Sequence, residues 1–336
     1  MRKPIHISPE FETDMQSYNT RLRKSSLPAP PSPSGWLDIH THFFPPRPAS
    51  EDEHLVAALR DAHFMVTSPP RFNPTELLAY GDRAGIAMQM LSNIPPTTAA
   101  LRASTDFGLS VVQAHPRRFG LLAALPTDEP AEAVRNGVGL GDERLRVVWE
   151  DLNRREEVVF VHPDAYTRGR DGRPSALIDV AFDTARTITD MLYNRVFLKF
   201  PDIKWVFAHC GGAFPALSGR VALLGAESWV LNAKGVTRED LQEQMARIHV
   251  DTAAAAGTGV EPAIKMTGIH HVVYGADCGV PCSTEATIEE NRRIVRNISE
   301  KVTGDGEFLG MNGFDLFPAA KMRVIGITSR DVGRQK

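Results

Sequence analysis

The sequence predicts an α/β protein whose parallel strands close into a (β/α)8 barrel. Short, nearly continuous apolar runs alternate along the chain with stretches in which apolar residues recur every three or four positions. Such runs are typical of strands covered on both faces, and the helical stretches between them make the connections parallel. At 336 residues the chain is long enough for one barrel with extensions.

The predicted strands and helices follow one another in regular order. The first strand begins at Trp36, and the later apolar runs are 87–91, 119–125, 158–161, 205–208, 248–250 and 271–275. Apolar side chains at helical spacing predict the helices, which include 75–84, 97–115, 175–196 and 284–300. The barrel is assigned to residues 35–325. Residues 1–34 are expected to be a disordered tail because their end is rich in proline and serine, and 326–336 a C-terminal tail.

One interval is too short for a regular barrel. Between the third strand and the strand at 158–161 the chain must fit a helix, a strand and another helix, whereas a single strand–helix–strand unit already takes about 30 residues. Only residues 126–157 are available, and a helix is expected at 143–155. We therefore expect the fourth strand to be an abbreviated or irregular one at 137–140, or to be missing.

Composition and charge limit the partners. The formal net charge is −3 and the basic residues are scattered, so nothing indicates a nucleic acid or an anionic membrane. No window approaches the ~20 apolar residues of a membrane helix, and the N-terminus has no apolar stretch of signal-peptide length. Three cysteines are too few for a disulfide framework and suit a reducing compartment. We expect a cytoplasmic protein with a small-molecule partner.

Polar side chains occupy the carboxyl ends of four predicted strands. They are His40 and His42 on the first strand, His162, His209 and Asp277. Strand residues two positions apart project to the same side, so both imidazoles of the first strand can reach one metal ion. Barrel strands converge on one opening at their carboxyl ends, so all five side chains are expected to meet there. Taken singly, each can also be a packed histidine or a capping aspartate.

The segments that carry these residues resemble a known family. The matching stretches are Leu37–Phe43, Val159–Pro163, Phe200–Gly212 and Val273–Asp277. They resemble the amidohydrolase superfamily, in its aminocarboxymuconate-semialdehyde-decarboxylase-like branch, over roughly residues 36–320. The resemblance implies a TIM barrel of the metal-dependent hydrolase type with one divalent metal ion, zinc first and manganese as the alternative. It implies His40, His42, His162 and Asp277 as metal ligands, with His209 beside the metal as an acid or base.

The chemistry of these residue types agrees with that implication. Three neutral imidazoles and one carboxylate around a divalent ion leave a charge of about +1, which makes a Lewis acid for an oxygen ligand. Histidine is the side chain type most often used to move a proton near neutral pH, which makes His209 a candidate for that step, and Asp277 is a second candidate. No lysine lies at 137–140 to bridge two metals, so one metal is expected. The three cysteines are expected to pack, not to bind metal.

Three further residues are candidates for substrate binding. Arg220 resembles an arginine that in this branch reaches the active site of a neighbouring subunit, which implies a homodimer. Its guanidinium can bind a carboxylate through two hydrogen bonds, or it can form an ion pair on a helix surface. Phe64 and Phe72 lie where the namesake enzyme has a second carboxylate-binding arginine. An apolar wall formed by these rings suits a small aromatic acid with one carboxylate.

Three functions are compatible with these residues. The leading one is a metal-dependent, non-oxidative decarboxylase of a small aromatic acid of the salicylate or orsellinate type, nearest in description to the 6-methylsalicylate decarboxylases of secondary metabolism. The second is hydrolysis of a lactone, ester or amide, because the same metal can activate water. The third is a catalytically impaired barrel with a binding role, since an incomplete barrel can open the site.

Overall fold

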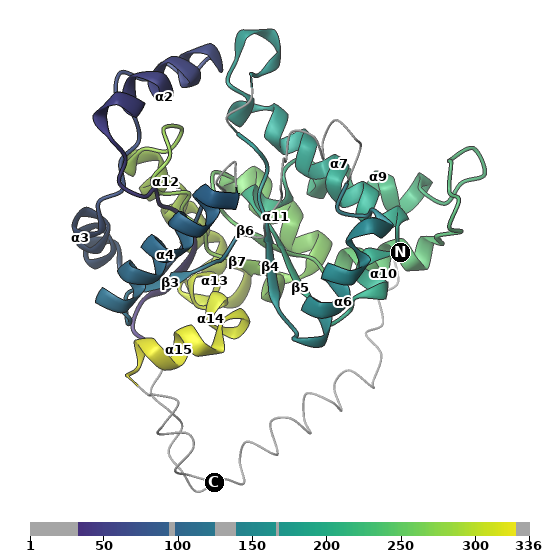
Figure 1. Cartoon of the computed structure of the whole chain (residues 1–336). Coiled ribbons are helices and arrows are strands. Elements are labelled where there is room, and N and C mark those ends of the chain that lie inside the picture. Colours follow the sequence, from purple (N-terminus) through teal and green to yellow (C-terminus); the bar gives the residue numbers. More distant parts are fainter. Residues whose placement is uncertain (1–32, 94–97, 125–138, 166–167, 327–336) are drawn as a thin grey trace, which may run out of the picture. The chain divides into compact units, whose positions relative to one another are not determined.

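A computed structural model describes residues 33–93, 98–124, 139–165 and 168–326. The strands in these ranges form two parallel sheets, with the orders β1-β2-β3 and β4-β5-β6-β7 (Figure 1). Their bounds are β1 (Trp36–His42), β2 (Ile86–Ser92), β3 (Phe119–Leu121), β4 (Val158–Val161), β5 (Lys204–Phe207), β6 (His249–Asp251) and β7 (Val272–Val273). Every pairing is parallel, which confirms the predicted strand direction.

Three backbone hydrogen bonds join β1 to the chain that follows β7. They run from Ile39 N–H to Tyr274 O (3.1 Å), from Asp277 N–H to His40 O (2.8 Å) and from His42 N–H to Cys278 O (2.8 Å). The two sheets are thereby continuous from β3 through β2, β1, β7, β6 and β5 to β4. One side of the predicted barrel is closed by these bonds.

The opposite side, between β3 and β4, is where the fourth strand was predicted. Residues 137 and 138 of that prediction lie outside the described residues, as does the interval 125–138 around them. Gly139 and Leu140 are not in a strand, and Gly139 O accepts a hydrogen bond from Asp142 N–H at 3.0 Å. Within the described ranges, no hydrogen-bonded pairing connects β3 to β4. Of the predicted terminal tails, 1–34 and 326–336, residues 1–32 and 327–336 also lie outside the described residues.

Helices alternate with the strands (Figure 1). They are α2 (Ala49–Asp61), α3 (Pro74–Ala84), α4 (Thr98–Ala114), α6 (Arg146–Arg154), α7 (Asp179–Tyr193), α8 (Val196–Lys199), α9 (Phe214–Leu224), α10 (Arg238–Ala246), α11 (Ala256–Thr267), α12 (Glu285–Thr303), α13 (Phe308–Met311), α14 (Gly313–Leu316) and α15 (Pro318–Val324). The four predicted helices correspond to α3, α4, α7 and α12, and the one expected at 143–155 to α6. Helix α2 is an addition that the sequence analysis did not predict.

Capping residues explain where α3 begins and ends. The Asn73 side chain accepts hydrogen bonds from the backbone N–H groups of Thr75 and Glu76, and Pro74 occupies the first turn. Gly85 ends the helix in the left-handed conformation at φ 69°. The chain then enters β2 directly, which brings its carboxyl end beside that of β1.

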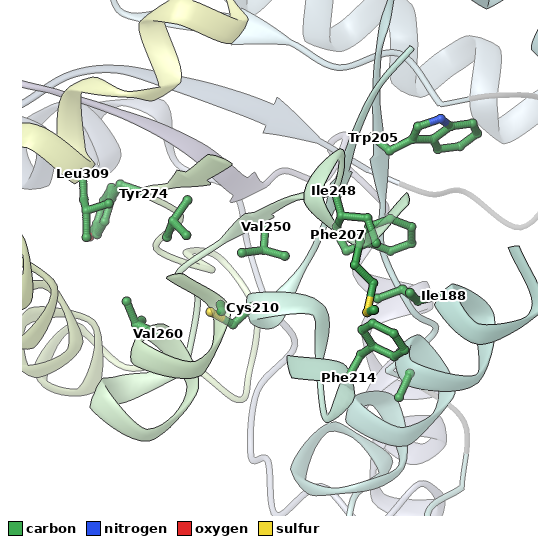
Figure 2. Packing of buried hydrophobic residues seen from close by; sticks show 14 of the residues in the cluster. Ile188, Trp205, Phe207, Cys210, Phe214, Ile248, Val250, Val260, Tyr274 and Leu309 are labelled. Carbon is green, nitrogen blue, oxygen red and sulfur yellow. The ribbon is translucent and has the colours of Figure 1, made fainter. Parts of the chain in front are cut away.

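Neighbouring residues of β5 pack into two different hydrophobic clusters. Trp205 and Phe207 lie in the cluster that includes Ile188 of α7 and Phe214 of α9 (Figure 2). Val206 lies in a second cluster with residues of the other sheet, among them Leu37. Because successive strand side chains face opposite ways, β5 packs on helices with one face and on the other sheet with the other. The sheets are thus covered on both faces, as their apolar sequences predicted.

Among the described residues, no helix combines the length and the apolar character needed to span a membrane.

Replacement of Gly310 by alanine is expected to destabilise the fold. A Cβ atom at this position lies 2.1 Å from Cδ2 of Trp36, whose side chain is buried. Overpacking of this kind costs about 1–3 kcal/mol. Urea denaturation should therefore show a lower free energy of unfolding for Gly310→Ala. The control is Gly219→Ala in α9, where a Cβ meets nothing within 4 Å and alanine raises helix stability by up to about 1 kcal/mol. Equal stability of the two variants would contradict this packing.

Candidate metal centre

The five polar side chains predicted at the strand ends lie together. The ring centroid of His40 is 5.0 Å from that of His42, 4.9 Å from that of His162 and 5.1 Å from that of His209. One donor atom each from His40, His162, His209 and Asp277 all lie within 4.8 Å of one another. His42 adjoins this group. The strand-end argument therefore predicted which residues meet.

Three donor atoms are spaced like the ligands of one metal ion. His40 Nε2 and His42 Nε2 are 3.0 Å apart, and Asp277 Oδ1 lies 3.3 Å from the first and 3.1 Å from the second. Zinc with nitrogen or oxygen ligands at 2.0–2.1 Å in a tetrahedron holds those ligands about 3.3 Å apart. The three separations match the edges of such a coordination polyhedron.

Hydrogen bonds orient two of the imidazoles so that their Nε2 atoms face the centre. His40 Nδ1 lies 2.7 Å from Asp251 Oδ2, and His162 Nδ1 lies 2.7 Å from the carbonyl oxygen of Pro163. Both partners are acceptors, so each Nδ1 carries a proton, and Nε2 is the atom that carries the lone pair when the ring is neutral. His162 Nε2 is buried and has no hydrogen-bond partner in the part of the chain that the structure describes. Buried polar atoms are rarely unsatisfied, so this atom fits a metal ligand.

Burial and the two carboxylates set the protonation of the cluster. Burial lowers the pKa of His42 and holds that of His162 well below its usual range. Burial also opposes a charge on His40, but Asp251 and Asp277 outweigh it and raise its pKa to about 10. Although burial favours the protonated acid, His40 above all holds the pKa of Asp277 well below its usual range. The two carboxylates thus favour a positive charge between them, and without a metal the protonated His40 supplies it. A bound metal ion would replace that charge, because imidazoles bind metal in their neutral form and release a proton on binding.

An unusual backbone turn presents His209. His209 and Cys210 have φ angles of 54° and 59°, a left-handed conformation that is uncommon for residues other than glycine. Gly212 follows at φ 60°, where a Cβ atom would lie 2.3 Å from the carbonyl oxygen of Ala181. Asp277 shares the conformation at φ 60°. Backbone strain of this kind is concentrated at functional sites.

Two residues that support the site were not singled out from the sequence. Asp251 ends β6 and contacts His40, and the strand-end rule that found the other residues applies to it as well. Ser283 Oγ donates a hydrogen bond to Asp277 Oδ2 at 3.1 Å. No sequence pattern marks Ser283, because it lies on a loop six residues from the aspartate. Cys210 and Cys278 are buried in the core, which agrees with their predicted packing, whereas Cys282 is exposed and the prediction of packing is wrong for it.

The predicted substrate-binding residues lie in three different places. Arg220 is exposed on α9, and among the described residues no ion-pair partner accompanies it. Phe64 is buried against Leu59 in a small cluster beside α2. The Phe72 ring contacts Phe43 edge-on with centroids 5.9 Å apart, next to the end of β1. Their substrate roles remain predictions.

Comparison with known proteins identifies a family and several related decarboxylases. The family model described as amidohydrolase matches residues 37–290. Among curated proteins, decarboxylase macB of Penicillium terrestre is 27% identical over 72% of this chain and 83% of its own length. The 6-methylsalicylic acid decarboxylase of Penicillium expansum is 24% identical over 72% of this chain and 84% of its own.

The fold of this chain is similar to that of a decarboxylase of known structure. Dihydroxybenzoic acid decarboxylase from Polaromonas, with bound manganese and the inhibitor 2-nitroresorcinol, superimposes with a TM-score of 0.66 at 16% identity. The match covers 88% of this chain and 100% of that one. At this identity the similarity concerns the fold, and it confirms the predicted barrel class.

Alanine variants separate the metal ligands from the acid or base. His162→Ala and His42→Ala are expected to lower the zinc content of the purified protein, because each removes a proposed ligand. His209→Ala should keep its zinc. The control is His271→Ala, a half-buried histidine that stacks on His249 outside the cluster. Metal content after dialysis is measured by mass spectrometry. Equal zinc loss in His162→Ala and His209→Ala would contradict the assignment and make His209 a ligand.

Proposed function

This chain belongs to the amidohydrolase family, and from that premise we propose that it is a metal-dependent, non-oxidative decarboxylase of a small aromatic carboxylic acid. The observation that carries the proposal is the cluster of donor atoms from His40, His162, His209 and Asp277 within 4.8 Å. The curated relatives named as decarboxylases, which match most of their own length, support the reaction. The substrate class proposed is the salicylate or orsellinate type, with 6-methylsalicylate as the first candidate and secondary metabolism as its setting.

The metal is proposed to be held by His40, His42, His162 and Asp277. Zinc suits imidazole and carboxylate ligands, and the manganese in the Polaromonas relative supports manganese as the alternative. When bound, the ion supplies a Lewis acid for the carboxylate and ortho-hydroxyl oxygens of the substrate.

The remaining chemistry is proton delivery. The bond between the ring carbon and the carboxyl carbon breaks, its electron pair stays on the ring carbon, and that carbon takes a proton while carbon dioxide leaves. No oxidant is consumed. His209 and Asp277 are the candidate donors, and His209 Nε2 lies 3.7 Å from Asp277 Oδ2. Because the pKa of Asp277 is held well below its usual range, mainly by His40 against the effect of burial, His209 is the better proton carrier.

Substrate recognition is proposed to involve a second copy of the chain. Arg220 would bind a substrate carboxylate in the neighbouring subunit, and Phe64 and Phe72 would form the apolar wall. Exposed apolar side chains near Arg220 support a homodimer: Leu217 and Leu223 lie on the same helix, 38% and 57% exposed. The three free cysteines support a cytoplasmic location.

Carbon dioxide release tests the reaction. Zinc- or manganese-loaded protein is expected to release carbon dioxide from 6-methylsalicylate and to lose this activity when the metal is chelated. Benzoate is the control substrate, because it lacks the ortho-hydroxyl oxygen and should react far more slowly. Hydrolysis of a lactone, ester or amide without any carbon dioxide release would instead support the alternative, a metal-dependent hydrolase. If the wild-type protein binds no metal and shows neither activity, a catalytically impaired barrel with a binding role would be supported.

Mixed dimers test the role of Arg220. Arg220→Ala and His162→Ala are each expected to be inactive alone. If Arg220 acts in the neighbouring subunit, random mixing gives heterodimers with one complete site, and activity should recover to about a quarter of the wild-type value. Activity is measured after unfolding and refolding the two variants together. No recovery from folded mixed dimers would contradict a role across the interface.

A further inference from the structure

Asp251 is placed to control two histidines of the site at once. Its side chain and that of His40 are fully buried, and Oδ2 lies 2.7 Å from His40 Nδ1. Its other oxygen, Oδ1, accepts hydrogen bonds from the backbone N–H groups of Ala253 at 3.0 Å and Cys210 at 3.4 Å. Cys210 directly follows His209. One carboxylate therefore joins β1 to the turn that presents His209.

The chain around Asp251 is held in place from a third element. Asn291 of α12 donates a hydrogen bond to Thr252 O at 2.7 Å and accepts one from Ala256 N–H at 2.9 Å. Asn291 is itself buried. These two bonds fix both ends of the segment 252–256, which directly follows β6. The Asp251 carboxylate therefore has little freedom to move away from His40.

Gly275 leaves the room in which His40 and Asp251 meet. A Cβ atom at this position would lie 2.9 Å from His40 Cβ, 3.0 Å from Asp251 Cβ and 3.1 Å from Asp251 Cγ. Cβ atoms essentially never lie under 3.0 Å from another heavy atom, and the two distances to Asp251 are also tighter than most Cβ contacts, so a side chain here would push the pair apart. The contact between the two residues is built into the packing of the segment after β7.

We propose that Asp251 is a positioning residue that fixes the tautomer of His40 for metal binding and sets the turn of His209. The inference rests on the proposed metal site and deepens it. A carboxylate that accepts from Nδ1–H holds the lone pair on Nε2 and makes that atom a stronger ligand. With Asp251 counted, two carboxylates balance the charge of a divalent ion.

The variant Asp251→Asn tests whether the carboxylate acts through its hydrogen bonds or only by filling space. The amide has nearly the same shape, but one of its two ends is a donor. If that end faces His40, it meets Nδ1–H and forces the proton onto Nε2, where the metal should bind. If it faces the other way, it meets the N–H groups of Ala253 and Cys210. Each orientation puts donor against donor, because every partner of Asp251 donates.

Asp38 supplies the matched control. It is also fully buried and also lies on a strand of the site. Oδ1 accepts from the backbone N–H groups of His40 and Ala276, and Oδ2 accepts from the Thr41 hydroxyl at 2.8 Å. In Asp38→Asn the amide oxygen keeps both backbone bonds, and the hydroxyl can turn to accept from the amide nitrogen. This variant removes a buried carboxylate without touching an imidazole ring.

Zinc affinity is measured for the full chain by competition with a chromophoric chelator. We expect Asp251→Asn to bind zinc about 10–100-fold more weakly than wild type, and Asp38→Asn to bind it as wild type does. Spectra of zinc-loaded wild type with ¹⁵N-labelled histidine should show a His40 Nδ1–H signal, and Asp251→Asn should lose this signal if its amide nitrogen faces His40. Wild-type zinc affinity in Asp251→Asn would overturn the proposal, because both orientations of the amide are expected to weaken zinc binding.

Gly275→Ala is the second variant, used also if Asp251→Asn does not fold. It pushes the same pair apart sterically and should weaken zinc binding too, whereas unchanged affinity would overturn the proposal. The outcomes separate the two levels of inference. If wild-type protein binds no zinc, the proposed metal site fails and this inference fails with it. If wild type binds zinc and both variants match it, only the role of Asp251 is wrong.

Discussion

The pairing of β1 with the segment after β7 is the contact on which the site depends. His40 and His42 lie on β1 of one sheet and Asp277 lies in the segment that follows β7 of the other. The bonds from His42 N–H to Cys278 O and from Asp277 N–H to His40 O hold them together. The strands that carry site residues, β1, β7, β5 and β4, all lie on the continuous side of the structure. The interval between β3 and β4, where no pairing is described, therefore does not separate them.

The second constraint is charge. Asp38, Asp251 and Asp277 are all buried within a few residues of the strand ends. Isolated carboxylates are expensive to bury, so such groups are hydrogen-bonded, paired or bound to metal. Asp38 is satisfied by hydrogen-bond donors, but burial still raises its pKa to about 6. Asp251 and Asp277 are instead turned toward His40 and the centre of the cluster, where a bound metal cation would compensate both.

The strands and the site residues could be predicted from the sequence. One helix and two backbone turns could not, for physical reasons. The run Val158–Val161 is β4 as predicted, because its apolar side chains have no helical spacing. The site residues were found because parallel strands end at one edge. Helix α2 was missed because it buries only Asp52 and Leu59 and begins without a side-chain cap. The left-handed turns at His209 and Asp277 were missed because neither residue is glycine.

The central claim is a metal centre built from imidazole and carboxylate, and X-ray absorption at the zinc edge of the loaded protein tests it most directly. The account predicts only nitrogen and oxygen neighbours at about 2.0–2.1 Å, with the outer scattering of several imidazole rings. A sulfur neighbour at about 2.3 Å would contradict it, because the metal would then be held by one of Cys210, Cys278 and Cys282 instead of the strand-end histidines.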